Sequence, residues 1–475
     1  MINFEKVLQA FEELSKYPRP SGQEKKVSDF LVSWGKERGL EVKQDGKYNV
    51  LMTRPAAKGK EGMPGIVMQG HMDMVCVKTD DSDHDFSKDP IEIVKDGKMI
   101  RAKDTSLGAD NGLGLAMGMA IIEDENTNLP MLELLVTTDE ETGMTGAMEL
   151  SKEWLKGKSL INIDSEKEGE LTAGCAGMET FFIDKPIEKE EAGQGFKPYK
   201  VVFSGLLGGH SAHAIVMKHG NMVKIIFEFL GNLSKEFKIK VKGVEVGTYD
   251  NVIPSAGSAE IAIKDFDEKK FQDLVSKTLK KYEDLDGQLK IELVEADCSE
   301  QCKVWTDQFL ASAVEAVEEM PNGLNTMLEE LGLPESSSNL ALAREEEGKL
   351  HMEISLRSAA TDKLKDMHGR IAKVLKDHNF PYDIGAESPA WNYVEHSELR
   401  DKACRIYKEH TGMDMKVIVT HGGLECGCIN EKYPEMDMIS VGSDIFGAHS
   451  VDEHFDIESG ERVFGYIQKL LKELK

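Results

Sequence analysis

Three short apolar runs in the first half of the chain are the feature that most constrains its fold. They cover residues 66–68, 132–136 and 160–163, and Gly, Pro or acidic residues bound each of them. Runs of this length and apolarity are typical of strands buried on both faces, as in a mostly parallel sheet. A helix is expected between them at residues 113–122, although Gly112, Gly114 and Gly118 make that segment a poor helix former. The sequence therefore predicts α/β structure up to about residue 180.

Two amphipathic helices are expected before the first of these strands. Phe4, Val7 and Phe11 recur at helical spacing after Asn3, which is expected to cap the first helix. Ser21 and Glu24 have the spacing of a capping box, so we expect them to begin the second helix.

The chain changes character at residues 185–198, a polar stretch that contains two prolines and two glycines. Beyond it the patterns predict strand 199–205, helix 215–232, strands 237–242 and 258–264, helix 267–282 and strand 288–294, the β-α-β-β-α-β order of a ferredoxin-like unit. A looser run of helix 305–319, strand 349–356 and helix 361–378 extends this unit, and α/β patterns resume after Pro389. We therefore predict an α/β protein in which residues 1–185 and 389–475 share a mostly parallel, mixed-sheet domain, with residues 186–388 inserted as a ferredoxin-like α+β lid domain.

The acidic composition argues against several classes of function. The 475 residues include 58 Lys and Arg against 85 Asp and Glu, a formal net charge of −27. We expect neither nucleic acid nor a membrane as a partner, because nucleic acids and anionic membranes favour basic surfaces. No apolar run approaches the ~18 residues that cross a bilayer, and the first residues lack the apolar core of a signal peptide. Seven cysteines without a CxxC pair argue against a disulfide framework, so we expect a cytoplasmic protein.

Residues with reactive side chains follow the predicted strands. His71 and Asp73 leave the first apolar run on the same side, so one can bind a metal while the other orients it. Further acids and a histidine stand at strand ends or small-residue turns: Asp110, Glu140, Glu141, Asp164 and His449. Singly, each has an ordinary explanation, such as a solvated turn or a helix cap. Together, two histidines, two aspartates and one glutamate form a set that suits two divalent metals sharing one carboxylate.

Seven motifs occur along the chain in a fixed order: HMDMV, GADNG, TTDEETGMTGA, INIDSE, GGHSAHAI, HGGLECG and GAHS. In this order they resemble the aminoacylase/carnosinase-type family of co-catalytic zinc metallopeptidases, and most of all its PepD-like branch of aminoacyl-histidine (Xaa-His) dipeptidases. The resemblance spans essentially the whole chain. It implies a zinc-dependent metallo-dipeptidase that hydrolyses the peptide bond of small unblocked dipeptides, Xaa-His included, by means of a metal-bridging water.

The resemblance also implies roles for individual residues. His71 and Asp164 would bind one Zn²⁺, Glu141 and His449 a second, and Asp110 would bridge both, with Co²⁺ or Mn²⁺ able to substitute. Asp73 would hydrogen-bond the ring of His71, and Glu140 would act as general base and then as general acid. A cis peptide bond is expected between Asp110 and Asn111.

Four further residues would bind substrate on the same grounds. His210 in the inserted domain would help to stabilise the oxyanion, and Asn251 and Arg357 would hold the substrate carboxylate, for which a guanidinium is well suited. Backbone amides of the turn at Gly423 would face the substrate. The resemblance further allows a homodimer through the inserted domain.

Other interpretations remain at this point. The same family contains tripeptidases, carboxypeptidases and N-acyl amino acid deacylases, although an insert of about 200 residues favours the dipeptidase branch. A binding protein without activity is disfavoured because Asp73, Glu140 and His210 are all present. Cys298, Cys302, Cys426 and Cys428 suggest a third metal site, but the last two are better interpreted as small residues packed on a helix.

Overall fold

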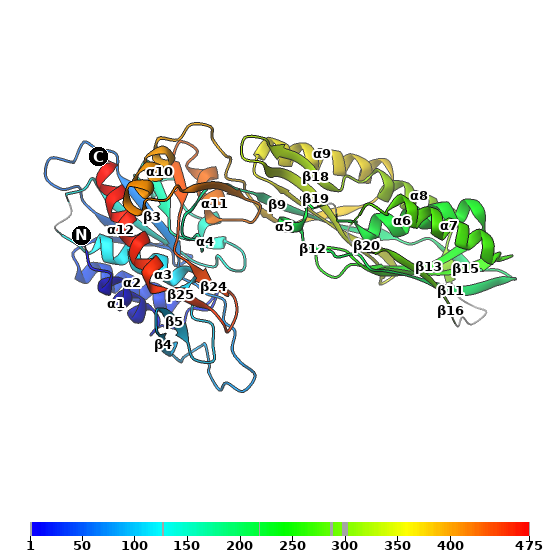
Figure 1. Ribbon diagram of the computed structural model, residues 1–475, viewed down its shortest axis with the longest axis horizontal. Helices are drawn as coiled ribbons and strands as arrows, with labels where there is room; N and C mark the ends of the chain where they lie inside the picture. The colour runs from blue at the N-terminus through cyan, green and yellow to red at the C-terminus, as the bar shows by residue number, and fades with distance from the viewer. Residues whose placement is uncertain (1, 126–127, 218, 286–287, 297–302, 475) are drawn as a thin grey trace. The chain divides into compact units, whose positions relative to one another are not determined.

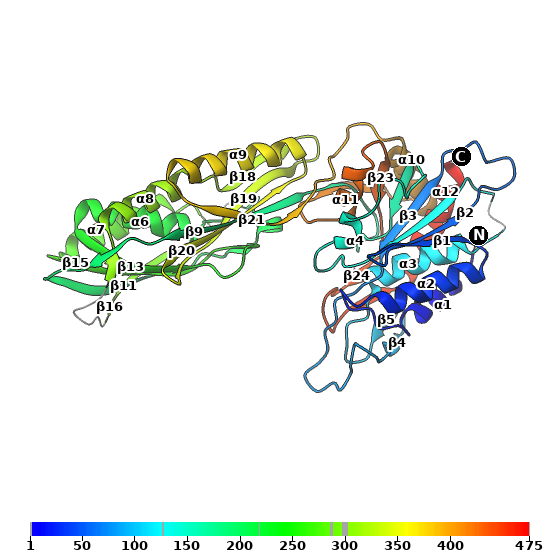
Figure 2. The ribbon, with the colours of Figure 1, turned by 180° about the vertical axis from the view of Figure 1, so that it is seen from behind.

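The computed structural model describes residues 2–125, 128–217, 219–285, 288–296 and 303–474. The chain forms two compact units: unit 1 consists of residues 1–175 and 390–475, and unit 2 of residues 176–389. The first change of unit precedes the predicted one at 185/186 because the segment Gly177–Pro186 is a long strand, β9, of the sheet in unit 2. Figures 1 and 2 show the elements of each unit from two opposite sides.

Unit 1 is built around a mixed sheet of eight strands. Its strand order is β1-β2-β6-β3-β7-β23-β8-β22, and the central pairs β6–β3, β3–β7 and β7–β23 are parallel. The strands of this sheet are β1 (Glu41–Gln44), β2 (Val50–Arg54), β3 (Ile66–His71), β6 (Leu132–Thr137), β7 (Ser159–Asn162), β8 (Glu170–Cys175), β22 (Lys416–Thr420) and β23 (Asp437–Ser440). A smaller sheet contains β4 (Ile93–Asp96), β5 (Met99–Ala102), β24 (Ile445–Phe446) and β25 (His454–Asp456).

Helices of unit 1 cover both faces of the large sheet. They are α1 (Glu5–Leu14), α2 (Lys25–Glu37), α3 (Ala109–Ile122), α4 (Thr145–Met148), α10 (Glu398–Thr411), α11 (Glu425–Lys432) and α12 (Ile457–Glu473). Alternate residues of β3 belong to two different hydrophobic clusters, one on each face of the sheet. Ile66 and Met68 share a cluster with residues of α1, α3 and α12, whereas Val67 shares one with residues of α11. This explains why β3 and β6 are buried at every position, as the apolar runs predicted. All residues of α3 are buried too.

Unit 2 contains a sheet of nine strands with helices on one face (Figure 1). The strands β11 (Phe196–Ser204), β13 (Lys238–Val246), β15 (Gly257–Lys264) and β16 (Lys290–Glu295) alternate with α6 (Met222–Glu236) and α7 (Glu268–Lys281) as predicted. Their spatial order, β16-β11-β15-β13, makes this part ferredoxin-like. The sheet continues with β19 (Leu333–Glu346), β20 (Lys349–Ser358), β9 and β21 (Tyr382–Ser388), while β18 (Gly323–Leu328) pairs with β19. The remaining elements are α5 (Ser211–Ala214), α8 (Asp307–Glu319), α9 (Thr361–Asp377), β10 (Lys189–Glu191), β12 (Gly209–His210), β14 (Val252–Ile253) and β17 (Lys303–Trp305).

Two local predictions are wrong, and one long strand was missed. The helix expected from residue 215 begins at Met222, because the side chain of Asn221 caps it by accepting from the Lys224 amide. Strand β19 was not predicted, since its buried segment 336–339 is polar and is held by pairing with β20. The expected capping box is absent from the start of α2, where the Ser21 and Glu24 side chains contact other segments of unit 1. The α/β fold class and the inserted α+β unit are confirmed. None of the described helices is long and apolar enough to cross a bilayer.

Candidate metal centre

The five predicted metal ligands converge at one edge of the large sheet. His71 is the last residue of β3, while Glu141 and Asp164 follow the ends of its parallel neighbours β6 and β7. Asp110 lies in the first turn of α3, and His449 lies in the loop between β24 and β25. Ligands bind off the carboxyl ends of parallel strands in open α/β sheets, because side chains from several segments meet there.

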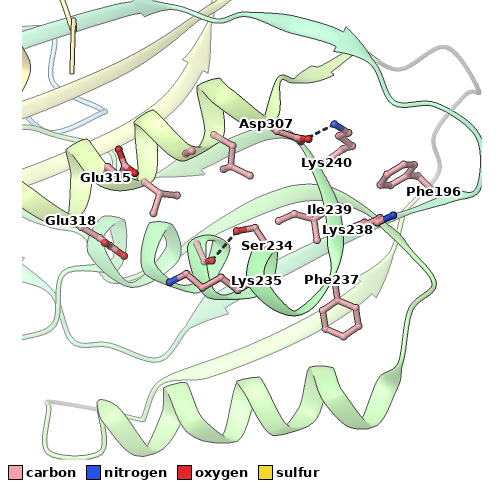
Figure 3. A pocket seen from close by; sticks show the side chains of 14 residues that line it. Phe196, Ser234, Lys235, Phe237, Lys238, Ile239, Lys240, Asp307, Glu315 and Glu318 are labelled. Carbon is pink, nitrogen blue, oxygen red and sulfur yellow. Dashed lines mark hydrogen bonds and ion pairs between the residues drawn. The ribbon is translucent and has the colours of Figure 1, made fainter. Parts of the chain in front are cut away.

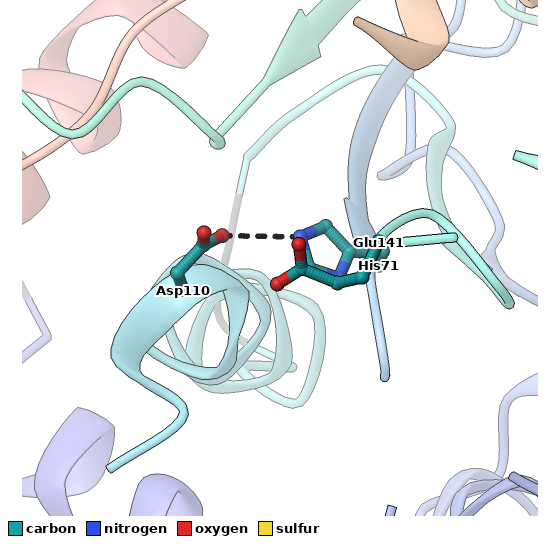
Figure 4. Close-up of side chains that lie close together, drawn as sticks. All are labelled: His71, Asp110 and Glu141. Carbon is teal, nitrogen blue, oxygen red and sulfur yellow. Dashed lines mark hydrogen bonds and ion pairs between the residues drawn. The ribbon is translucent and has the colours of Figure 1, made fainter. Parts of the chain in front are cut away.

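Asp110 stands between the two imidazoles. One of its carboxylate oxygens, Oδ1, is 3.1 Å from Nε2 of His71, and the other, Oδ2, is 3.2 Å from Nε2 of His449. His71 Nε2 is also 3.4 Å from Oδ1 of Asp164, and His449 Nε2 is 2.9 Å from Oε2 of Glu141. Ligand atoms of His71, Asp110 and Glu141 all lie within 4.8 Å of one another (Figure 4). The peptide bond between Asp110 and Asn111 is cis, as expected.

The residues of this cluster fit a divalent metal. Among the described residues, Oε1 of Glu141 and Oδ1 of Asp164 are buried atoms with no hydrogen-bond partner. Burial raises the pKa of Asp164 to about 6, and hydrogen bonds with Asp110 and Glu141 raise the pKa of His449 to about 11. The carboxylates of Asp110 and Glu141 contribute to both shifts, because crowded acidic charge favours protonation where a cation would otherwise balance it. Imidazole nitrogens and carboxylate oxygens are the ligands that Zn²⁺ takes in hydrolase sites.

Asp73 connects the His71 strand to the turn that carries Glu140 and Glu141. Nδ1 of His71 is 3.1 Å from the carbonyl oxygen of Asp73 and 3.4 Å from its carboxylate, so a proton on Nδ1 leaves the Nε2 lone pair facing the cluster. The Asp73 carboxylate also accepts from the backbone amides of Glu140, at 3.1 Å, and of Glu141, at 3.2 Å. Asp73 is fully buried, and although burial opposes ionisation, the hydrogen bond with His71 contributes to lowering its pKa.

Glu140 supplies a carboxyl group beside the cluster that is suited to proton transfer. Its Oε2 is 4.0 Å from Nε2 of His71, and its side chain is 14% exposed. Burial, together with the neighbouring charge of Asp164, raises its pKa well above the ordinary value for glutamate. A general base works best when its pKa lies near the operating pH, and burial shifts a glutamate in that direction.

Sequence patterns missed two residues of the segment before α2 that support this turn. The Ser21 hydroxyl donates to Oδ2 of Asp73 at 2.8 Å. The buried carboxylate of Glu24 accepts from the amide of Asp139 at 3.0 Å, immediately before Glu140. Their capping-box spacing was a signal that both side chains bind backbone or polar groups, but it did not indicate which ones.

A buried polar network also crosses the sheet beneath the ligands. The side chain of Gln69 in β3 accepts from Asn162 of β7 at 2.6 Å and donates to Glu425 at 2.6 Å, and Thr137 of β6 donates to the same carboxylate oxygen at 2.6 Å. Glu425 begins α11 and is completely buried, which raises its pKa to about 8. The three strands that lead to His71, Glu141 and Asp164 are therefore joined by side chains as well as by backbone pairing.

The predicted substrate residues are divided between the two units. Gly423 lies in unit 1, in the turn before α11, whereas His210, Asn251 and Arg357 lie in unit 2. His210 is exposed in β12, and its Nδ1 accepts from the Ala212 amide. Arg357 lies in β20 and is buried, with 8% of its surface exposed. Asn251 lies in the turn before β14, and the neighbouring Asp250 carbonyl accepts from Ser355 of β20.

The remaining candidates stand apart from this cluster. Cys426 and Cys428 are buried in α11, which raises the pKa of both thiols, while Cys298 and Cys302 lie outside the described residues. A surface groove of about 680 Å³ in unit 2 lies beside α6, α8 and β13 (Figure 3). None of the predicted site residues lines that groove.

An α/β sheet with histidines and carboxylates gathered at its strand ends is typical of an enzyme that uses a divalent metal. Comparison with known proteins identifies the family to which the chain belongs. The sequence model of Peptidase family M20/M25/M40 matches residues 67–473, and the chain belongs to this family. It is therefore an enzyme that hydrolyses peptide bonds with a divalent metal.

Two relatives cover nearly the whole chain. Cytosol non-specific dipeptidase of Escherichia coli (strain K12) is 32% identical over 481 residues, which are 98% of this chain and 96% of that protein. The crystal structure of aminoacylhistidine dipeptidase from Vibrio alginolyticus matches with a TM-score of 0.93 at 32% identity, covering 100% of this chain and 97% of that one. Aminopeptidase PepT from Bacillus cereus ATCC 10987, at 15% identity and a TM-score of 0.56, shares the fold. The resemblance drawn from the seven motifs is confirmed.

Proposed function

We propose that this chain is a dipeptidase that cleaves the peptide bond of small unblocked dipeptides, including those that end in histidine. The observation that carries the proposal is the convergence of His71, Asp110, Glu141, Asp164 and His449 at one sheet edge, with the Glu140 carboxyl beside them. Similarity to two dipeptidases over nearly the whole chain supports it. Neither of these relatives is named as a tripeptidase, a carboxypeptidase or a deacylase.

We propose two Zn²⁺ ions per chain, with Co²⁺ or Mn²⁺ as substitutes. His71 and Asp164 would hold one ion and Glu141 and His449 the other, while Asp110 has one oxygen near each histidine and would be shared. When bound, such ions polarise a carbonyl and lower the pKa of water to about 7.

The protein's own residues have distinct tasks in this reaction. Asp73 keeps the proton of His71 on Nδ1 and holds the 140–141 turn through its two backbone amides. Glu140 takes a proton from the attacking water and then delivers it to the nitrogen of the leaving amine. Arg357 and Asn251 would bind the substrate carboxylate, His210 the developing oxyanion, and the backbone at Gly423 the substrate. These substrate contacts rest on the motif resemblance.

The first experiment is a substrate panel with metal-reconstituted and chelated enzyme. Dipeptides, including Xaa-His peptides, are compared with tripeptides and N-acyl amino acids of matched side chains. We expect cleavage confined to unblocked dipeptides and abolished by the chelator. Cleavage of only the longer or acylated substrates would overturn the dipeptidase assignment, and undiminished cleavage without metal would overturn the metal centre.

We further propose a cytoplasmic location and a homodimer through residues 186–388. The name of the E. coli relative supports the location. Unit 2 exposes the apolar side chains of Leu207 and Tyr249, each at 69%, and of Met217 at 58%, which we propose to be covered in the dimer. Sedimentation velocity of the native chain and of Met217→Glu tests the dimer: we expect a dimer that the charge weakens, and a monomeric native chain would refute it.

A further inference from the structure

A buried glutamate binds the backbone that carries Asp110. Glu453 is 2% exposed, and its two carboxylate oxygens accept from four consecutive amides. Oε2 accepts from Leu107 and Gly108 at 2.8 Å each, and Oε1 from Ala109 at 2.7 Å and Asp110 at 3.1 Å. One side chain therefore holds the backbone amide of the central residue of the metal centre together with the three amides before it.

These four amides need an acceptor from outside the helix. They precede α3 or lie in its first turn, where the backbone departs from helical angles. Gly108, before α3, has a left-handed conformation with φ 69°, and Asp110 (ψ 111°) and Asn111 (φ −105°) depart from helical angles inside the first turn. The first amides of any helix lack partners within it, and they must be satisfied by a side chain when water is excluded. Glu453 performs this task for residues 107–110.

Arg19 binds the same segment by donating to a backbone carbonyl oxygen. Its guanidinium, 1% exposed, donates to the carbonyl oxygens of Gly108 at 2.6 Å, Met72 at 3.0 Å and Asp73 at 3.3 Å. Gly108 is thus held at its amide by Glu453 and at its carbonyl by Arg19. A Cβ atom at Gly108 would lie 2.4 Å from Nη2 of Arg19, and one at Gly112 2.6 Å from the same atom. Gly108, just before α3, and Gly112, within it, therefore leave room for the guanidinium, which a Cβ atom at either position would crowd.

Together the two side chains connect three segments that carry metal ligands. Arg19 joins residues 72–73, directly after His71, to residue 108, and Glu453 joins residues 107–110 to its own loop, four positions after His449. The charge of Glu453 counteracts the burial that lowers the pKa of Arg19, in a region where either charge alone would be costly. Neither residue is among the five ligands.

We propose that Arg19 and Glu453 are positioning residues that place Asp110, His71 and His449 at the separation required for metal binding. The inference rests on the metal centre of the proposed function. Residues that orient metal ligands from behind typically change metal affinity by about 10–100-fold when replaced. Glu453→Gln keeps the size of the side chain but turns an amide NH₂ toward two of the four backbone donors, so it should loosen residues 107–110.

The test compares three variants by their affinity for Co²⁺ and by the visible spectrum of the Co²⁺-loaded protein. Glu453→Gln is the main variant, and Arg19→Lys, which keeps the charge but not the fork of donors, serves if the first does not fold. Glu133→Gln is the matched control, since Glu133 is also completely buried and accepts from the backbone amides of Lys156 and Gly157, at the opposite end of β6 and β7 from the ligands. Urea unfolding of the metal-free proteins measures the stability of each.

We expect Glu453→Gln to weaken Co²⁺ binding by about 10–100-fold and to change the spectrum, with a smaller loss for Arg19→Lys. Glu133→Gln should lose stability but keep the affinity and spectrum of the native protein. If Glu453→Gln or Arg19→Lys loses only stability, as the control does, the positioning role is refuted while the metal centre stands. If the native chain itself binds no Co²⁺ and cleaves no dipeptide, the proposed function fails and this inference fails with it.

Discussion

Replacing Gly114 by alanine tests whether the contact between α3 and the end of β7 holds the metal centre together. A Cβ atom at Gly114 would lie 2.0 Å from the carbonyl oxygen of Ile163 and 2.8 Å from Nδ2 of Asn111. Asn111 donates to that same carbonyl, and each residue adjoins a predicted ligand, Asp110 in one case and Asp164 in the other. The added methyl group therefore enters the place where two ligand segments meet.

The size of the effect follows from these distances. Contacts of a real Cβ atom essentially never fall under 3.0 Å, so the helix and the strand end must separate by about 1 Å. Alanine stabilises a helix interior by about 0.5–1 kcal/mol relative to glycine. Overpacking costs typically 1–3 kcal/mol, and the upper part of that range applies because the obstacle is a backbone carbonyl. We expect a net loss of about 1–2 kcal/mol in the free energy of unfolding. A shift of about 1 Å can lower turnover by roughly 10²-fold.

Gly118→Ala is the matched control, one helical turn further along α3. Its Cβ atom would lie 2.6 Å from Cδ1 of Leu134, the end of a flexible side chain that can rotate away. Urea unfolding, metal titration and dipeptide hydrolysis are measured for both variants. We expect Gly118→Ala to stay within about 1 kcal/mol of the native protein and to keep its activity. The reasoning is refuted if Gly114→Ala matches the control in stability, metal affinity and turnover.

Three further predictions concern the base, the metal and the effect of pH. Glu140→Ala should retain both metal ions but lose about 10²–10⁴-fold in turnover, and normal hydrolysis by this variant would exclude Glu140 as the general base. Removing metal with a chelator should lower the melting temperature, since a ligand at 100 times its Kd stabilises the folded state by about 2.7 kcal/mol; an unchanged melting temperature in the chelated protein would contradict a metal that binds only the folded chain. Burial opposes ionisation of Glu123, but hydrogen bonds from Lys6 and Arg38 outweigh it and lower its pKa below 4.5. The native protein should thus be more stable than Glu123→Gln above pH about 5, and the difference in unfolding free energy should disappear as the pH falls through that lowered pKa; a difference that persists in acid would refute the ion-pair explanation.

Much of the fold could be predicted because its signals are local. The buried runs at 66–68, 132–136 and 160–163 became β3, β6 and β7, since a strand covered on both faces is apolar at nearly every position. The strand and helix order from 199 to 294 predicted the ferredoxin-like part of unit 2, because each of these elements also has its own local hydrophobic pattern. Strand β19 escaped prediction because its buried polar residues, such as Asn339, are satisfied by groups distant in sequence, including the carbonyl of Val252.

The sequence by itself determined which side chains can do chemistry in this protein. His71, Asp110, Glu141, Asp164 and His449 follow strands or glycine-rich turns, and the order of the motifs around them carried the family resemblance. Only the tertiary structure decided how these residues are held. Ser21 and Glu24, which have the spacing of a helix cap, instead bind Asp73 and the amide of Asp139. Glu453 binds amides that precede it by more than 340 positions. A carboxylate accepts from any donor within reach, so its partner is chosen by the packing of the whole unit, and no local pattern records that choice.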